Sequence, residues 1–310
     1  MNDISPSNQT KLLGLDRYIS ELIGLSKKNK LPNKILLSGN KGIGKSTLAY
    51  HFVNYSLSID EEFNYDKINF KINENNRSFK TIQNQSNLNF ILIDIYPDKK
   101  LIDINQIRNL ILNLNKSSFN KKARFILIDN IELLNINSIN ALLKILEEPT
   151  NNVHFILINN NKKILSTLSS RCLNFKIFLS HNECLKISNN LLNGQLNSLI
   201  NDDLINYYLT PGNVYKLIKF AQINKYDLVN MDLRNFLKLI IKDQHYKKDE
   251  NIKFFFFDLI EYYFRKINQS ISSTIHDKYS YFLKRISDTR KFNLDEESLF
   301  VEFEEEILNG

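Results

Sequence analysis

Residues 39–47 read Gly-Asn-Lys-Gly-Ile-Gly-Lys-Ser-Thr, and this stretch decides the fold. Its spacing, G-x-x-x-x-G-K-[ST], is that of a phosphate-binding loop. The apolar run 35–37 before it is typical of a buried strand, and residues 48–53 after it favour a helix. The chain has only eight glycines, and three of them lie in this loop: Gly39, Gly42 and Gly44. A plain glycine-bearing turn is the alternative, but the strand–loop–helix context favours a phosphate site.

The residue types in this loop predict how it would hold a nucleotide. Backbone N–H groups and the positive end of the following helix would surround the phosphates. Lys45 would reach the β- and γ-phosphates, and Ser46, which precedes Thr47, would hold Mg²⁺. The loop therefore predicts a nucleotide and a magnesium ion at one place.

Composition limits the class of protein. A chain of 310 residues with 43% hydrophobic residues predicts two or three globular domains. It has no apolar run long enough to span a membrane, and residues 1–5 do not resemble a signal peptide. Cys172 and Cys184 are too few for a disulfide framework or a four-cysteine zinc site, so we expect a cytoplasmic protein. The net charge of +7 permits contact with nucleic acid or an acidic partner, but it is spread over many lysines.

Apolar strands alternate with amphipathic helices as far as Leu179. Such alternation predicts a parallel sheet covered on both faces, with ligands at the carboxyl ends of its strands. The polar, Asn-rich segment 60–87 predicts either a long excursion or a weakly ordered loop. Strands are expected over four further ranges, 90–93, 124–129, 154–158 and 174–178, and helices over 104–114 and 137–148.

Beyond Leu179 the periodicity is helical only. Residues 210–213 mark one boundary and residues 222–226 a second. The stretch 254–264 contains four consecutive Phe and is apolar on nearly every face of a helix. It must therefore be buried, either within a helical bundle or against another subunit.

Four stretches together resemble one family. Residues 103–110 precede a strand that ends in Asp129, and residues 140–149 read Asn-Ala-Leu-Leu-Lys-Ile-Leu-Glu-Glu-Pro. Residues 165–172 end in Ser-Arg-Cys. With the phosphate loop, their order and spacing resemble subunits of the bacterial DNA polymerase III clamp loader, an assembly of AAA+ proteins. The similarity is dense between residues 30 and 178 and faint beyond.

The resemblance implies an architecture, a cofactor and partners. It implies an α/β AAA+ core with a parallel sheet over residues 1–179, a helical lid over 180–222 and a helical collar for oligomerisation over 223–310. It implies ATP with Mg²⁺, the metal held by Ser46 and Asp129, and a γ-phosphate sensor at Asn159. The implied partners are the tau/gamma and delta subunits and, through the assembly, the sliding clamp and primed DNA, with no membrane.

Departures from the family pattern distinguish two kinds of subunit. ATP-hydrolysing tau/gamma subunits carry a catalytic Glu after the Asp of this strand, where this chain has Asn130, and an amide cannot act as a base. Glu132 is two positions too far along. The segment 60–87 has no Cys, so the four-cysteine zinc module of the motors is not expected. Where their lid carries a sensor Arg, this chain has Tyr215 beside Lys216. These losses favour the delta prime type of subunit. The resemblance then implies little or no ATPase activity for the isolated chain, which would work as a component of the polymerase III holoenzyme.

The Ser-Arg-Cys element implies that Arg171 is an arginine finger, which acts on the nucleotide of a neighbouring subunit. A plain surface arginine is the alternative. The pair Glu147-Glu148 is interpreted as helix-end charges or a subunit contact. Two other functions stay open: a self-sufficient ATPase motor of tau/gamma type, and a stand-alone P-loop kinase, for which no acceptor-substrate site is evident.

Overall fold

The computed structural model describes residues 4–96, 99, 101–114, 120, 122–147, 152–205, 209–248, 250–268, 273–292 and 294–309. Contacts divide the chain into two compact units. Unit 1 comprises residues 1–187 with 210–212, and unit 2 comprises residues 188–209 with 213–310. Each unit is described separately below.

Unit 1 is built on a five-stranded parallel sheet in the order β2-β3-β4-β1-β5. Its strands are β1 (Lys34–Ser38), β2 (Phe90–Ile93), β3 (Arg124–Ile128), β4 (Val153–Asn159) and β5 (Leu173–Lys176). Its helices and turns are η1 (Pro6–Asn8), α1 (Asp16–Lys27), α2 (Lys45–Leu57), α3 (Arg77–Gln83), α4 (Ile104–Leu114), η2 (Ile131–Leu133), α5 (Ile136–Glu147) and α6 (Ser166–Ser169). Helix α7 (His181–Leu191) begins in this unit.

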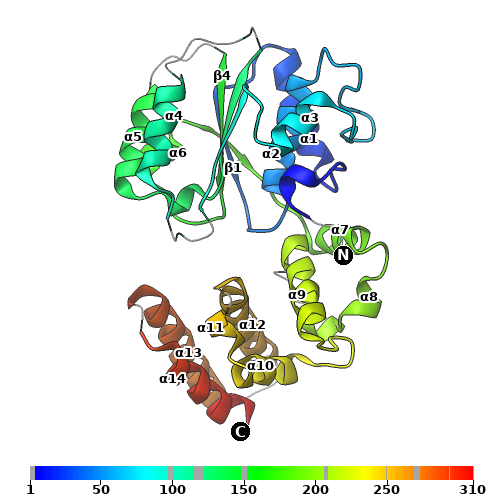
Figure 1. The fold of residues 1–310 in the computed structure, drawn as a ribbon. Coiled ribbons are helices and arrows are strands. Elements are labelled where there is room, and N and C mark those ends of the chain that lie inside the picture. The colour runs from blue at the N-terminus through cyan, green and yellow to red at the C-terminus, as the bar shows by residue number, and fades with distance from the viewer. Residues whose placement is uncertain are drawn as a thin grey trace. The chain divides into compact units, whose positions relative to one another are not determined.

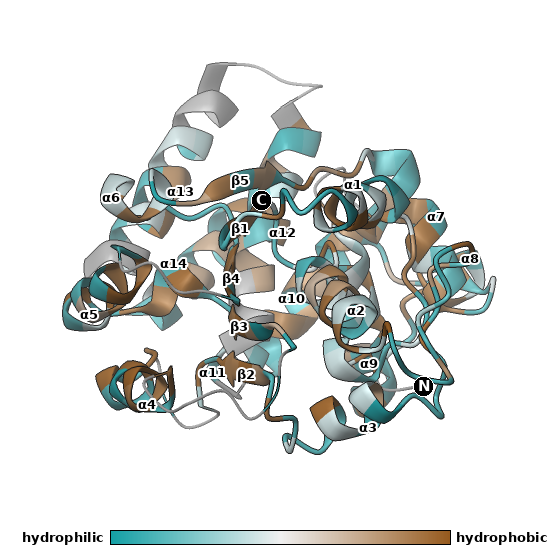
Figure 2. Ribbon diagram, turned by 90° about the horizontal axis from the view of Figure 1, so that it is seen from above, coloured by the Kyte–Doolittle hydropathy of each residue, from teal (hydrophilic) through white to brown (hydrophobic). Residues whose placement is uncertain are grey.

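Helices cover both faces of the sheet, with α4, α5 and α6 on one side and α1, α2 and α3 on the other (Figure 1). Figure 2 shows hydrophobic residues both along the strands and on the helices that cover them. Leu110 of α4 and Leu142 of α5 are fully buried against Ile126 and Leu157 of the sheet. Helix α2 follows β1 and buries ten of its thirteen residues, so it is a central element of the unit. The predicted α/β core with a parallel sheet is confirmed.

The predicted elements agree with the structure to within a few residues. The helix 104–114 is found with the same bounds, and each strand lies within two residues of its predicted limits. The largest shift is at β5, which ends at Lys176; at Phe178 the backbone N–H donates to the Tyr18 hydroxyl rather than to a strand, and this side chain is 67% exposed.

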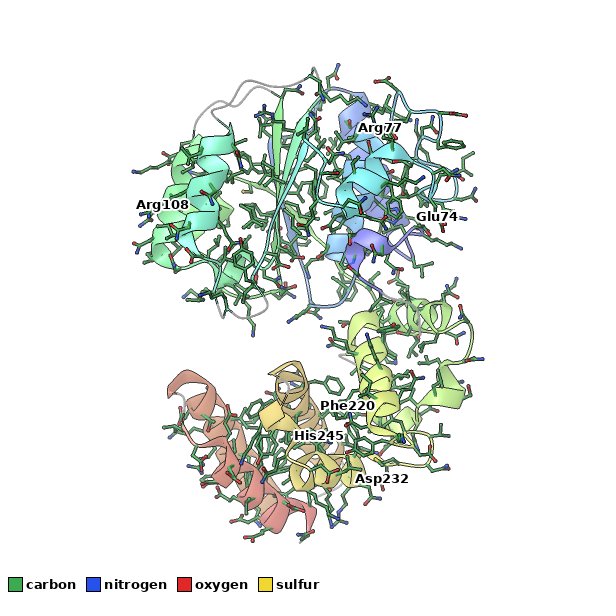
Figure 3. All side chains as sticks on the ribbon, viewed as in Figure 1. Glu74, Arg77, Arg108, Phe220, Asp232 and His245 are labelled. Atoms are coloured by element: carbon green, nitrogen blue, oxygen red, sulfur yellow. The ribbon has the colours of Figure 1, made fainter. Side chains whose placement is uncertain are left out.

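The segment 60–87 is an ordered excursion rather than a weakly ordered loop. Asn76, which is completely buried, caps α3 by accepting a hydrogen bond from Phe79 N at 2.7 Å. The same side chain accepts from Asn54 of α2 at 2.9 Å and donates to Phe63 O at 2.7 Å. One amide thereby ties the excursion to α2, and Figure 3 shows Glu74 and Arg77 on its outer side.

The described residues of unit 2 form helices joined by turns and include no strand. Its elements are α8 (Leu196–Leu199), η3 (Asp202–Leu204), α10 (Leu233–Lys242), α11 (His245–Lys248), α12 (Glu250–Asn268), α13 (Ser273–Phe292), α14 (Glu296–Phe303) and η4 (Glu304–Leu308), with α9 (Pro211–Asn224) shared with unit 1 at its first turn. Phe220 of α9 meets His245 of α11 edge to face, with ring centroids 4.9 Å apart (Figure 3). None of the helices described in the two units is long and apolar enough to cross a bilayer.

The aromatic helix α12 is covered by the chain itself. Phe256 and Phe257 both contact Phe300 of α14, with centroids 4.9 and 5.2 Å apart. Phe264 packs on Phe282 and Phe303. Each of these six side chains is at most 1% exposed. Of the two expected covers, a bundle and another subunit, the bundle is the one observed. The division at residues 179 and 222 into core, lid and collar stays a prediction.

Candidate nucleotide site

The phosphate loop joins β1 to α2 in a shape that requires glycine. A Cβ atom at position 39 would lie 2.4 Å from the carbonyl oxygen of Ile177, a distance that no side chain tolerates. Gly44 has a φ of 93°, in the left-handed region that glycine favours, and it caps the helix that begins at Lys45. The predicted strand–loop–helix arrangement is thus present, with Thr47 half-buried in the first turn of α2.

The Lys45 ammonium lies inside the loop. It donates to the carbonyl oxygens of Gly39 and Asn40 at 2.9 and 2.7 Å and to Asn160 Oδ1 at 2.9 Å. Burial lowers the pKa of Lys45 from 10.5 to about 8, a shift that the nearby Asp129 carboxylate opposes. All three acceptors are uncharged oxygens, so a phosphate would be a stronger partner for this cation.

Ser46 and Asp129 meet at the carboxyl end of β3. The Ser46 hydroxyl donates to Asp129 Oδ2 at 2.5 Å. Burial raises the pKa of Asp129 to about 6, and the hydrogen bond from Ser46 opposes that rise. A hydroxyl beside a carboxylate is the hard oxygen donor set that Mg²⁺ prefers, and a divalent cation would compensate the buried carboxylate charge. The two predicted magnesium ligands therefore fit the metal.

Asn130 occupies the position after Asp129 with a φ of 54°, in the left-handed region that asparagine tolerates well. Its side-chain amide donates to Asp94 Oδ1 at 2.7 Å and accepts from Asn160 Nδ2 at 2.8 Å. Both ends of the amide are therefore occupied. This position supplies the site with a neutral group and no carboxylate.

The side chains of Asn159, the predicted sensor, and of its neighbour Asn160 contact different parts of the site. Asn159 is 6% exposed, and its side chain donates to Lys162 O at 3.0 Å and accepts from Lys162 N at 3.2 Å, which closes the turn after β4. Asn160 instead reaches Lys45 and donates to Glu132 Oε1 at 2.7 Å. The residue beside the phosphate loop is Asn160, and a sensor role for Asn159 stays a prediction.

Residues 210–212, which belong to unit 1, lie on the phosphate loop. Thr210 Oγ1 donates to Lys41 O at 2.8 Å, and Gly212 N donates to Gly42 O at 2.9 Å. A Cβ atom at Gly212 would approach Gly42 to 2.9 Å. The sequence marks residues 210–213 only as a boundary, because nothing in a Thr-Pro-Gly turn indicates what it contacts.

The remaining predicted residues take no part in the hydrogen bonds described above for Lys45, Ser46 and Asp129. Arg171 lies between α6 and β5, and its guanidinium contacts Thr167 O and Glu147, at 2.6 and 2.5 Å. Glu147 thus makes a contact within its own chain, while Glu148 and Pro149 lie outside the described residues. In unit 2, Tyr215 is buried and Lys216 is exposed. The two cysteines are free thiols.

Two residues of the site escape sequence reasoning. Asp94 follows β2 directly, as Asp129 follows β3. Because β2 and β3 are parallel neighbours, both residues lie at the same edge of the sheet, and this position after a strand is the sequence signal that could have found Asp94. Asn160 sits in a run of three asparagines, where spacing alone does not tell which amide points at the loop.

Comparison with known proteins identifies the family of this chain. Residues 14–179, more than half of the chain, match the family model described as DNA polymerase III, delta subunit. The DNA polymerase III subunit gamma of Buchnera aphidicola subsp. Schizaphis graminum is 28% identical over 63% of this chain and 57% of its own. The subunit delta' of Buchnera aphidicola subsp. Baizongia pistaciae is 41% identical over 24% of this chain and 22% of its own.

One solved structure, a DNA polymerase III gamma subunit-related protein from Thermotoga maritima, aligns over 93% of this chain and 95% of its own, at 17% identity and a TM-score of 0.45. The matched region thus spans little more than half the length of the gamma subunit and less than a quarter of the length of the delta' subunit. The family match covers the sheet, the phosphate loop and Arg171 together. The chain therefore belongs to the DNA polymerase III, delta subunit family.

Proposed function

We propose that this chain is a clamp-loader subunit of the delta prime type. It binds Mg-ATP without appreciable turnover on its own, assembles with tau/gamma and delta subunits, and supplies Arg171 to the nucleotide site of a neighbour. Through that assembly it helps to place the sliding clamp on primed DNA. Residues 1–179 form the AAA+ core, 180–222 the lid and 223–310 the oligomerisation collar in this proposal.

The observation that carries the proposal is the contrast between an intact phosphate site and a missing base. Lys45, Ser46 and Asp129 are brought together. Asn130, at the position of the motors' carboxylate, is an amide with both ends hydrogen bonded. An amide cannot take a proton from an attacking water, so binding is retained while hydrolysis lacks its base.

Each binding residue then has a separate task. The Lys45 ammonium leaves its carbonyl partners for the β- and γ-phosphates, and the α2 N-terminus adds its backbone N–H groups. Ser46 and Asp129 hold Mg²⁺, which when bound neutralises charge on the phosphates.

Calorimetry and turnover measurements on the purified chain test the proposal. Mg-ATP should bind, Lys45→Ala should remove the binding, and steady-state hydrolysis should stay at background. An exposed lysine, Lys27→Ala, is the matched control, because it lies at the solvated end of α1. Rapid turnover that Lys45→Ala abolishes contradicts the delta prime assignment.

The role of Arg171 is tested in the reconstituted assembly. Arg171→Ala should leave the chain's own fold and nucleotide affinity unchanged but lower the ATPase rate of the assembly, since arginine fingers contribute about 10³–10⁵ in rate at the site they serve. Arg171→Lys should restore little, because a point charge does not reproduce the forked guanidinium. An unchanged rate returns Arg171 to a surface role.

A second candidate, an ATPase motor of tau/gamma type, is favoured by one observation. The Glu132 carboxylate accepts from Asn160 Nδ2 at 2.7 Å, and Asn160 also contacts Lys45. The Glu132 carboxylate is thus connected to Lys45 of the phosphate loop through a single side chain, that of Asn160. In the motor assignment this carboxylate would act as the base. If the purified chain hydrolyses ATP and Glu132→Gln stops it without loss of binding, the motor assignment replaces the first.

A further inference from the structure

The Arg171 guanidinium is held at two points by its own chain. Its Nη2 atom donates to Glu147 Oε1 at 2.5 Å, and its Nη1 atom donates to Thr167 O at 2.6 Å. Thr167 belongs to α6, four residues before Arg171, whereas Glu147 is the last residue of α5. Helices α5 and α6 lie on the same side of the sheet (Figure 1). Two separate elements therefore fix one side chain.

The position of Glu147 is not explained by the stability of its own helix. Glu147 lies two residues before Pro149, which disfavours continuation of a helix, so its carboxylate is near the negative end of the helix dipole, which disfavours it. The two side chains are 56% and 33% exposed, for Glu147 and Arg171, and ion pairs this accessible contribute little to folding. What the pair does accomplish is to restrict the rotamers of a long and flexible arginine.

The restraint leaves the guanidinium able to bind a further anion. An arginine side chain carries five N–H donors, and the two contacts use one on each terminal nitrogen. The remaining donors keep the planar forked geometry that suits a phosphate. One third of the side-chain surface is exposed, so these donors are accessible from outside the chain.

We propose that Glu147 is a positioning residue that orients Arg171 toward a phosphate on a neighbouring subunit. The inference rests on the proposed function, because it deepens the role of the arginine finger. Glu147 touches no substrate and acts only through Arg171. Pre-orienting the guanidinium removes the cost of ordering it when the neighbour's nucleotide reaches its reactive state.

The test compares five full-length variants in the reconstituted assembly: Glu147→Gln, Glu147→Asp, Arg171→Ala, the double variant of Glu147→Gln with Arg171→Ala, and Glu21→Gln as an exposed helical control on α1. Glu147→Gln keeps the shape but loses the charge that holds the guanidinium. Its kcat for ATP should fall about tenfold with KM unchanged, because misplacing a reacting group lowers turnover without weakening substrate binding. Glu147→Asp should recover part of the loss, and Glu21→Gln should behave as the unaltered protein.

The double variant separates positioning from a general structural effect. In the Arg171→Ala background, Glu147→Gln should cause no further loss, since its effect passes through Arg171. A further loss there, an unchanged rate, or a faster rate in the single variant overturns the inference; a faster rate would make Glu147 a latch. If Arg171→Ala itself has no effect, the proposed function fails instead, and the inference fails with it.

Discussion

At the scale of single residues, burial moves the pKa values of two charged groups in the phosphate site toward neutrality. The pKa of Asp129 rises to about 6, and that of Lys45 falls to about 8. A cation on Asp129 requires the ionised carboxylate, whereas a phosphate on Lys45 requires the protonated amine. Both ligand-binding forms are therefore populated together only between these two values.

We expect the affinity for Mg-ATP to be highest between pH 6 and 8. Below the pKa of Asp129 a proton must leave before the metal binds, and above the pKa of Lys45 a proton must be taken up, so affinity falls by up to about tenfold per pH unit on either side. Calorimetric titration across this range measures it. Asp129→Asn should remove the protein's part of the acid-side loss, so a loss that persists unaltered belongs to the nucleotide itself.

Asn160 and Asn159 offer a matched pair of substitutions. Asn160→Ala removes an acceptor from Lys45 and a donor from Glu132, so we expect it to change nucleotide affinity by about 1 kcal/mol, the size of one hydrogen bond. Asn159→Ala breaks only the turn to Lys162 and should lower thermal stability with little change in affinity. The opposite pattern would support the prediction that Asn159 is the sensor.

The sequence predicts those site residues whose role follows from a motif. Lys45, Ser46 and Asp129 are found together because a phosphate loop and the end of a neighbouring strand have fixed relations in a parallel sheet. Asp94 and Asn160 were missed because their contacts depend on side-chain direction after a strand ends, where the regular alternation of the strand no longer applies.

At the scale of elements, a short turn far along the chain restrains the phosphate loop. Thr210 and Gly212 donate to the carbonyl oxygens of Lys41 and Gly42. A phosphate is bound by N–H donors, so contacts to carbonyl oxygens do not use the groups that a phosphate would need. The first turn of α9 is therefore part of the phosphate site's framework.

Gly212→Ala should disturb this framework. Its Cβ would lie 2.9 Å from Gly42 Cα and O, so backbone must shift, and we expect nucleotide affinity to fall severalfold. Gly24→Ala on α1 is the control, because nothing lies within 4 Å of its added Cβ. That substitution should instead stabilise the protein by about 0.5–1 kcal/mol, since alanine favours a helix. Equal affinity in the two variants contradicts a role for the 210–212 contact.

Helices and strands could be predicted where one of their faces is apolar. The prediction was open where hydrogen bonds between polar side chains determine whether a segment is ordered. Helix 104–114 follows from its periodicity, which buries Ile107 and Leu110. The order in the Asn-rich segment 60–87 depends on one buried amide, Asn76, whose partners come from three different segments. Composition identifies such a residue as loop-forming and says nothing of these partners.

At the scale of the whole molecule, the apolar residues of α12 contribute to a core that is separate from the sheet. Its aromatic rings pack edge to face or tilted against Phe300, Phe282 and Phe303, all of unit 2. Sequence periodicity shows that this helix must be buried on nearly every side, but it does not show how many helices of the same chain surround it. Here the helices that follow α12 along the chain supply those side chains.

Two cores predict two thermal unfolding transitions, each with its own sensitivity. Saturating Mg-ATP should stabilise only unit 1, raising its free energy of unfolding by about 2.7 kcal/mol at a hundredfold excess over the dissociation constant.

Substitutions in the two cores should act separately. Phe256→Ala should lower only the free energy of unfolding of unit 2, by about 3–5 kcal/mol, because it empties a fully buried ring site against Phe300. Phe52→Ala in α2, equally buried, should lower the other one. Val301→Ala, 44% exposed on α14, is the control and should shift neither by more than about 0.5 kcal/mol. Differential scanning calorimetry resolves the two, and a single transition that moves as a whole with every variant would mean that the units unfold as one.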